Sequence, residues 1–383
     1  MNDEPACIPT PVRQTPIYRW LTWLVALALL SVGCVPLPPQ TASSPAPEAL
    51  PLVVLDWEND ITPEILQGFT AETGIPVELR YYYSAEEAYR RILEGETCDL
   101  AIVANDKVPG LIRAERLLTL DLTRVPNFRH IAPAFRDLVI DPENRYSVPY
   151  SWGTTGFVYH PAHVTSSLTQ WADLWDEHYA GRIFLWEDPR TVIGLTLKSL
   201  GYSASSEDLQ ALNLAAAKLN TWQTLPPAPY RPEALAEAFR SGRAQVAVAW
   251  VGDYLLARRE IPDLVYALPA EGSILWMDHF VLPRSARNPE AALRLLDYLL
   301  RPEVAAQITA QSLWATANET SWAQVKLDPD VQGLVFPPAE ALTNAELTLP
   351  LSPAAEMAYN RMWEQFVRLR SSSPEMIPSP TPP

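Results

Sequence analysis

Short apolar runs alternate with amphipathic segments along most of this chain, and this alternation constrains the fold more than any other feature. The run LVVLD, residues 52–56, precedes TPEILQGFTAETG, residues 62–74. In the second segment Thr62 can cap a helix, Pro63 suits the first helical position, and Gly74 can end the helix. Three further segments continue the pattern: VELRYYY (77–83), AEEAYRRIL (85–93) and DLAIV (99–103). This order is typical of an α/β lobe with a mostly parallel sheet.

A second set of alternating segments begins after YSVPYSWGTTGFVYH, residues 146–160. Its members are the strand-like RIFLWED (182–188), the helical TVIGLTLKSLG (191–201), a strand that runs into a helix in QVAVAWVGDYLLARRE (245–260), and the helical NPEAALRLLDYLLRPEVAAQIT (288–309), in which Asn288 precedes Pro289. A chain of 383 residues is long enough for two cores. We therefore expect an α/β protein with two lobes.

The two ends of the chain have a different character. Arg13 and Arg19 precede WLTWLVALALLSVG, an apolar stretch that ends at Cys34 and is short for a membrane span. The small residues before Cys34 resemble a bacterial lipobox, so we expect residues 1–34 to be a signal peptide with lipid on Cys34. An uncleaved anchor and plain secretion are the alternatives. Residues 35–51 suit a Pro/Ser-rich tether, and residues 371–383 suit a disordered tail.

Cysteine content and charge narrow the class further. Cys98 has no partner for a disulfide in the mature chain, so we expect a buried small hydrophobe. The formal net charge of −16 argues against nucleic acid and anionic membrane surfaces as partners, and it favours the approach of cations.

Enzyme and metal signatures are absent from the sequence. It contains no G-x-S-x-G elbow, no P-loop, no G-x-G-x-x-G after a strand, no H-E-x-x-H and no C-x-x-C. We expect no catalysis and no cofactor. The histidines are scattered, and we expect solvated loop residues rather than metal ligands: His130, His160, His163, His178 and His279.

Tryptophans and acids occur together at the ends of strand-like runs. Thirteen tryptophans are present, and Trp57, Trp186, Trp250 and Trp276 each have an acid within the next three residues. Ligands bind at the carboxyl ends of strands in parallel α/β sheets. Aromatic faces and carboxylates together suit an organic cation. Core packing and helix capping are the alternatives for each residue alone, and Asp188, before Pro189, can act as a cap.

Four segments carry a resemblance to a known family: residues 56–89, 141–160, 167–192 and 272–305. They begin DWENDITPEIL, DPENRYSVPYS, SLTQWADLW and GSILWMDHFVLP, and in order and spacing they resemble the spermidine/putrescine-binding proteins of bacterial ABC importers. The likeness extends over about residues 52–368. It implies a type II periplasmic-binding-protein fold with the ligand in a cleft between two lobes, whose hinge closure presents both lobes to a permease. The implied lobes are residues 52–153 with 278–322, and 154–277 with 323–370.

The resemblance also implies the residues of the cleft. Five stand where the family places its cleft residues: Trp57, Asp188, Trp250, Trp276 and Asp278. Trp314 stands where the family has a tyrosine. By this resemblance Asp278 and Asp188 pair with amines of the ligand, while Trp250 and Trp276 stack on its methylene chain.

Several cleft positions depart from the family pattern. Asp60 stands in place of a tyrosine, Ala104 and Asp106 replace a serine and a tyrosine, and Thr191 replaces a glutamate that grips the far amine. We count Asp60 and Asp106 among the candidate ligand-binding residues. The changes move negative charge toward the N-terminal lobe, so the ligand is expected to be cationic while its length stays open.

The expected function is a receptor for a polyamine or related organic cation. We expect it to be a monomer, lipid-anchored in the periplasm or outside the cytoplasmic membrane, with an ABC permease as partner. The alternatives are a ferric ion, thiamine or a small anion in the same fold, and a recruited enzyme or sensor subunit. Tyr81–Tyr83 would suit a ferric ion, but strand alternation buries at least one of them. An anion needs basic residues or free helix N-termini, and Arg190 is the only arginine near the candidates.

Overall fold

The computed structural model describes residues 50–58, 60–164, 168–222, 225, 228–231 and 233–372. These residues all belong to one compact unit of the chain. The expected signal peptide with Cys34 and most of the expected tether lie outside the described residues, as do residues 373–383. No helix within the described residues is long and apolar enough to cross a membrane.

One ten-stranded mixed sheet organises the described part of the chain. Its main path runs β2-β1-β3-β8-β4-β6-β5, with β10 beside β8 and with β7 and β9 beside β4. β1 is parallel to both β2 and β3, as the sequence pattern predicts, whereas β8 is antiparallel to β3 and β4. The strands are β1 (Leu52–Trp57), β2 (Val77–Tyr82), β3 (Leu100–Ala104), β4 (Ser147–Tyr159), β5 (Ile183–Leu185), β6 (Val246–Trp250), β7 (Val265–Ala267), β8 (Ile274–Val281), β9 (Ala315–Thr316) and β10 (Glu346–Leu347).

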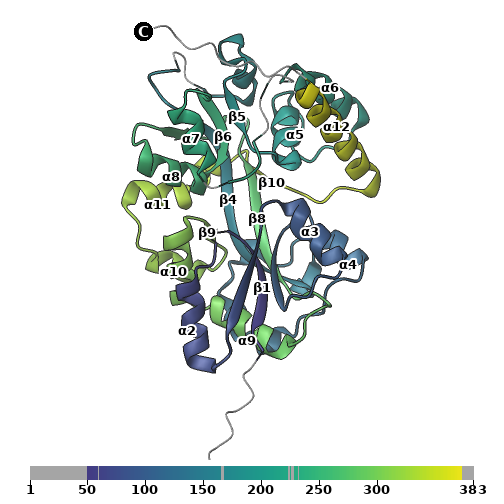
Figure 1. Cartoon of the computed structure of the whole chain (residues 1–383), viewed down its shortest axis with the longest axis vertical. Helices are drawn as coiled ribbons and strands as arrows, with labels where there is room; N and C mark the ends of the chain where they lie inside the picture. Colours follow the sequence, from purple (N-terminus) through teal and green to yellow (C-terminus); the bar gives the residue numbers. More distant parts are fainter. Residues whose placement is uncertain are drawn as a thin grey trace, which may run out of the picture. The chain divides into compact units, whose positions relative to one another are not determined.

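Helices lie on both sides of this sheet (Figure 1). α5, α6 and α12 pack against one another, and α7 packs against α8. The helices are α2 (Pro63–Thr73), α3 (Ala85–Leu93), α4 (Val108–Arg113), α5 (Pro189–Lys198), α6 (Leu209–Leu219), α7 (Ala234–Arg240), α8 (Val251–Glu260), α9 (Pro289–Leu299), α10 (Pro302–Ser312), α11 (Pro329–Val335) and α12 (Pro353–Ser372).

Among the described residues, the buried apolar side chains form four clusters that fall into two groups. Two clusters draw on residues 52–150 and 280–317. The other two draw on residues 152–277 and 313–366. We call the two groups the N-terminal and the C-terminal lobe. The predicted assignment of chain segments to the two lobes, with its residue boundaries, stays a prediction.

β4 and β8 connect the two lobes (Figure 1). They pair antiparallel from Ser147 with Val281 to Thr155 with Ile274, and the register shifts between Pro149 and Ser151. Phe280 contributes to an N-terminal cluster, while Ile274 contributes to a C-terminal one. The two strands therefore belong to both lobes.

Several local predictions are confirmed and others are wrong. Gly74 ends α2 in a left-handed conformation with φ 71°. Thr62 occupies the predicted N-cap position of α2, but its side chain makes no capping hydrogen bond and instead donates its hydroxyl to Gln311. Cys98 is free and buried, and burial raises the pKa of its thiol to about 12.

The expectation of solvated histidines is wrong for His279, because it lies inside β8 and is fully buried. Burial lowers the pKa of its imidazole to about 3.

Candidate ligand-binding site

A narrow cavity lies where several strands end. β1 ends at Trp57, β3 at Ala104 and β6 at Trp250, and all three residues line the cavity. Its enclosed volume is about 70 Å³, which is small beside the roughly 300–1,000 Å³ of sites for drug-sized ligands. The lining residues are Trp57, Glu58, Asp60, Ala85, Ala104, Asp188, Tyr230, Trp250, Trp276, Asp278 and Trp314. We call this space the aromatic cavity, and its small volume suits a small ligand.

Five aromatic rings form the apolar wall of the aromatic cavity. The ring centroid of Trp57 is 5.9 Å from that of Tyr230 and 6.3 Å from that of Trp250. Trp250 lies 6.4 Å from Trp276, which in turn meets Trp314 edge to face at 5.0 Å. Trp57 packs with the N-terminal clusters, and Trp250 and Trp314 pack with a C-terminal one. The wall is therefore built by both lobes.

Two glycines lie against indoles of this wall, and their lack of a side chain leaves the space that these rings occupy. A Cβ at Gly153 of β4 would lie 2.4 Å from Cζ2 of Trp276. A Cβ at Gly252 of α8 would lie 2.4 Å from Cζ3 of Trp314. Because real Cβ atoms do not approach other atoms so closely, either side chain would move the indole beside it.

Asp60 and Asp278 bring two buried carboxylates to one end of the aromatic cavity. Their side chains keep little exposure, at 2% and 7%. Among the residues that the structure describes, neither forms an ion pair with a lysine or arginine. Burial raises the pKa of Asp60 to about 7, against a hydrogen bond that Tyr150 donates at 3.1 Å. Burial and the charges of Asp60 and Asp106 raise the pKa of Asp278 well above its usual value.

Asp56 adds a third buried acid, close enough to Asp60 and Asp278 for their charges to act on it. It is fully buried in β1, and its Oδ2 accepts a hydrogen bond from the backbone of Ile61 at 3.2 Å. Its Oδ1 has no partner among the described residues. Burial and the charge of Asp60 raise the pKa of Asp56 well above its usual value. Uncompensated acids in an apolar surrounding favour a cation, because a cation restores the stability of their ionised forms.

Asp188 lines the aromatic cavity where Glu86, Asp106 and Lys107, rather than Asp60 or Asp278, are the neighbouring charges, and we call this part its other end. It caps α5, accepting a hydrogen bond from the backbone N–H of Thr191 at 2.7 Å, and it also lines the cavity. Burial and the charge of Glu86 raise its pKa to about 6. Asp188 therefore caps a helix, which the sequence left open as an alternative, and it also lines the cavity.

Asp106 lies beside the aromatic cavity rather than in its wall. Its Oδ2 is 3.3 Å from Nζ of Lys107 and 3.5 Å from Nη1 of Arg190. Although burial opposes it, the charges of these two cations hold the pKa of Asp106 below its usual value. Asp106 lines a crevice next to the cavity, between α3, α4, α5 and α12.

Seven of the eight predicted site residues therefore line one cavity, and Asp106 is the exception. Sequence reasoning missed Tyr230 and Ala85 as lining residues. Ala85 begins the helix after β2, whereas Tyr230 lies in a loop between proline-rich residues, where no strand or helix pattern marks it. Tyr230 donates its hydroxyl to Asp253 at 3.2 Å, and Trp186 donates its indole N–H to the same carboxylate at 3.2 Å.

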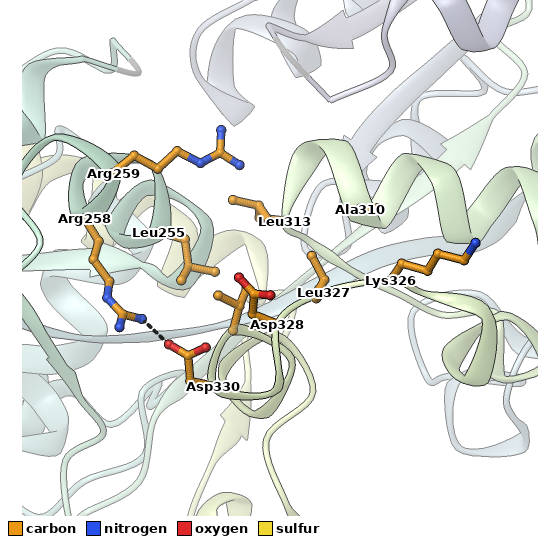
Figure 2. A pocket seen from close by; sticks show the side chains of 10 residues that line it. Leu255, Arg258, Arg259, Ala310, Leu313, Lys326, Leu327, Asp328 and Asp330 are labelled. Carbon is orange, nitrogen blue, oxygen red and sulfur yellow. Dashed lines mark hydrogen bonds and ion pairs between the residues drawn. The ribbon is translucent and has the colours of Figure 1, made fainter.

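A larger groove of about 760 Å³ lies between α8, α10 and α11 (Figure 2). Arg258 and Asp330 form an ion pair in it at 2.8 Å, and Arg259, Lys326 and Asp328 also line it. None of the eight predicted residues lies there. Its cations are a poor match for a cationic ligand, so the smaller aromatic cavity is the better candidate site.

Two tests of the alternative ligands concern ferric ion. Tyr82 is fully buried and donates its hydroxyl to the carbonyl of Ile102 at 2.8 Å, which confirms that strand alternation buries one of the three adjacent tyrosines. In the described part of the chain no three histidine, cysteine or acidic side chains are grouped to hold a metal ion.

A family model described as "Bacterial extracellular solute-binding protein" matches residues 64–333. The chain belongs to this family. The spermidine/putrescine-binding periplasmic protein of Escherichia coli (strain K12) is 30% identical to this solute-binding protein over 335 residues, which are 86% of this chain and 93% of that one.

Two solved structures are similar to this solute-binding protein at 30% identity. A putative spermidine/putrescine ABC transporter protein from Listeria monocytogenes gives a TM-score of 0.76 and covers 82% of this chain and 98% of its own. The spermidine/putrescine ABC transporter substrate-binding protein PotD from Streptococcus pneumoniae gives 0.72 and covers 84% of this chain and 100% of its own. The predicted family and the predicted two-lobe, type II binding-protein fold are confirmed.

Proposed function

We propose that this chain is the substrate-binding receptor of an ABC importer and that it captures a polyamine or related organic cation in the aromatic cavity. The observation that carries the proposal is the placement of Asp60 and Asp278, which are buried among indoles and have no lysine or arginine among the described residues to neutralise them. The relatives support it, because their names give spermidine and putrescine as ligands.

The chemistry of the cavity suits an alkyl ammonium ion. An ammonium group at Asp60 and Asp278 forms charge-assisted hydrogen bonds, which are about twice as strong as neutral ones. The indole faces of Trp250 and Trp276 attract the cation and cover its methylene groups, at roughly 0.5–2 kcal/mol for each cation–π contact. Asp188 is available to a second amine at the far end. Several contacts of this size must act together to give useful affinity.

Closure of the two lobes around the ligand completes the site, because Trp57 comes from one lobe and Trp250 from the other. Hinge closure of this kind is one way in which a binding protein signals occupancy to its permease. The proposed receptor carries out no covalent chemistry, in keeping with the binding-protein names of its relatives.

The test is calorimetric titration of the purified full-length protein with putrescine, spermidine and spermine. Binding of at least one of them with a Kd below about 100 μM, near −5.5 kcal/mol, supports the proposal. The variant Asp278→Asn should lose about 2 to 5 kcal/mol of binding, because it removes a buried partner of an ammonium group. The control is Asp263→Asn, which removes the same charge at an exposed position. If thiamine or iron binds while none of the amines does, the proposal is wrong.

The proposed receptor works outside the cytoplasmic membrane as a monomer, held by lipid on Cys34. The apolar stretch before Cys34 supports this, and the curated relatives are periplasmic proteins. Mass spectrometry of the membrane-extracted protein should find an N-terminal Cys34 with a lipid mass. Release of Cys34→Ser from the membrane fraction is the matching result, whereas an unmodified Cys34 inside an intact leader contradicts the anchor.

A further inference from the structure

Four charged side chains beside the aromatic cavity form a row of ion pairs. Glu86 Oε1 lies 2.9 Å from Nζ of Lys107, and the same Nζ lies 3.3 Å from Oδ2 of Asp106. That carboxylate oxygen also lies 3.5 Å from Nη1 of Arg190. The signs alternate along the row, so its two acids are balanced by its two bases. We call Glu86, Lys107, Asp106 and Arg190 the end wall.

The end wall separates the aromatic cavity from the crevice next to it. Its members line the crevice, while their close neighbours Ala85, Ala104 and Asp188 line the cavity. Three different chain segments therefore turn one residue to the cavity and another, one or two positions later, to the crevice. Glu86, Asp106 and Lys107 are also the charges that act on Asp188, so a ligand group at Asp188 lies close to the end wall.

Arg190 is held in place from the C-terminal lobe. Its Nη2 donates to the carbonyl of Leu349 at 2.6 Å and to the hydroxyl of Ser205 at 3.2 Å. Its guanidinium carbon lies 5.4 Å from the ring centroid of Tyr359. The contact with Asp106 reaches across to the N-terminal lobe, since Asp106 follows β3. With partners on both sides, Arg190 is a fixed positive charge at this end of the site.

The two ends of the aromatic cavity differ in their charge balance. Asp60 and Asp278 have no lysine or arginine partner among the described residues, whereas the acids of the end wall are paired inside the chain. An ammonium group is attracted at the first end. A further ammonium group beyond Asp188 meets Arg190 and Lys107, and like charges placed against a competing ligand are a common source of specificity.

We propose that the end wall limits the length of the ligand, so that this receptor binds a diamine in preference to a triamine. The proposal rests on the proposed function and specifies its ligand class. A diamine places one ammonium group at Asp60 and Asp278 and the other at Asp188. The third ammonium group of a triamine would lie against the positively charged Arg190. The nearby acid Asp106 is already paired with this arginine.

The test compares putrescine, a diamine, with spermidine, a triamine, by calorimetric titration of the full-length protein. The wild-type protein should bind putrescine at least tenfold more tightly than spermidine. In Arg190→Gln the end wall loses one of its two positive charges while Asp106 keeps Lys107 as a partner, so the end wall carries a net negative charge and the ratio of spermidine to putrescine affinity should rise at least tenfold. Arg113→Gln is the control, because Arg113 also lines the crevice but is not part of the end wall. It should change the ratio less than threefold.

A second variant keeps the test decisive if the first variant misfolds. Its expected effect on the ratio of spermidine to putrescine affinity has the opposite sign. Asp106→Asn keeps the shape of the side chain and leaves Arg190 without its acid, so spermidine should bind still more weakly relative to putrescine. Wild-type preference for spermidine, or an unchanged ratio in both variants, overturns the end wall as a length filter while leaving the receptor function intact. Binding of neither amine by the wild-type protein overturns the proposed function itself, and this inference with it.

Discussion

The hydroxyl of Tyr150 lies 3.1 Å from Oδ1 of Asp60, a residue of the aromatic cavity, and donates a hydrogen bond to it. Both side chains are buried, with 4% and 2% exposure. This hydrogen bond favours the ionised carboxylate, whereas burial favours the protonated form and raises the pKa of Asp60 to about 7. The protonation state of Asp60 is therefore set near neutral pH by two opposing contributions.

Binding of a cation should depend on pH through Asp60. The ammonium ion prefers the ionised carboxylate, so affinity should rise about tenfold from pH 6 to pH 8 for a single group with a pKa of about 7. Titration of putrescine at both pH values, in buffers of different ionisation enthalpy, should also reveal proton release on binding. Equal affinity at the two pH values with no proton release would contradict the raised pKa.

Removing the hydroxyl of Tyr150 should shift this pH dependence. In Tyr150→Phe the ionised form of Asp60 loses a hydrogen bond, so the pKa of Asp60 rises further and the affinity at pH 7 falls. The midpoint of the pH profile should move to higher pH. Tyr298→Phe is a matched control, because its hydroxyl donates to the carbonyl of Ile65 and lies outside the cavity wall. An identical profile in Tyr150→Phe would mean that this hydrogen bond does not tune Asp60.

Gly153→Ala should weaken ligand binding without touching the ligand. The new Cβ would lie 2.4 Å from Cζ2 of Trp276, so the indole must move within the cavity wall. We expect at least a tenfold loss of putrescine affinity in calorimetric titration. Gly333→Ala is the control, since a Cβ there meets nothing within 4 Å. Unchanged affinity in Gly153→Ala would remove the position of Trp276 from the determinants of binding.

Asp253 should make the stability of the protein fall as pH rises. It is fully buried, and burial raises its pKa to about 7, against hydrogen bonds from Tyr230 and Trp186. The folded protein thus keeps a proton that the unfolded chain releases near pH 4, so this group's stabilising contribution is complete below pH 4. The contribution is lost between about pH 4 and pH 7, at roughly 1.4 kcal/mol for each pH unit. In Asp253→Asn the decrease in Tm from pH 5 to pH 7 should be smaller than in the wild type, and an equal decrease would contradict the assignment.

The ion pair between Lys198 and Glu346 should contribute measurably to stability. Nζ of Lys198 lies 2.7 Å from Oε1 of Glu346, and the lysine side chain is only 4% exposed while the glutamate is 35% exposed. Glu346→Gln leaves a buried ammonium group unpaired, so urea unfolding should show a loss of about 2–3 kcal/mol. Glu94→Gln breaks the exposed pair with Arg90 and should cost less than about 0.5 kcal/mol. Equal effects of the two variants would show that burial of Lys198 does not matter.

The sequence predicted the features of this fold that depend on local patterns. The strand-to-helix transition at Trp250 and the cap at Asn288 follow from apolar periodicity and side-chain chemistry, and both are present. The very short strands β9 and β10 could not be predicted, because two residues carry no period. His279 was misassigned because a single polar residue in an apolar run does not reveal which surroundings bury it.

The cavity was predictable where its residues end strands and unpredictable where they do not. Trp57 ends β1, which is parallel to β2 and β3, and Trp250 ends β6, which is parallel to β5. Trp276 and Asp278 share one face of β8 because they are two residues apart. Tyr230 lies in a loop that no periodicity marks. The pairing of Asp106 with Arg190 depends on the approach of two distant segments. The sequence alone therefore marked Asp106 as a candidate, but it did not reveal that Arg190 forms an ion pair with this acid.

Because β3 pairs with β8, the sheet cannot be completed until most of the chain has been synthesised. Ala101 of β3 pairs with Val281 of β8, and β4 also needs β8 as its neighbour. At a synthesis rate of about 5–20 residues per second, the first strands exist for roughly 10 seconds or more before their central partner has been made. Contacts so distant in sequence also slow folding itself. The nascent chain thus has no complete sheet until late in synthesis. The residues that would bind the ligand come together only after most of the chain has been synthesised.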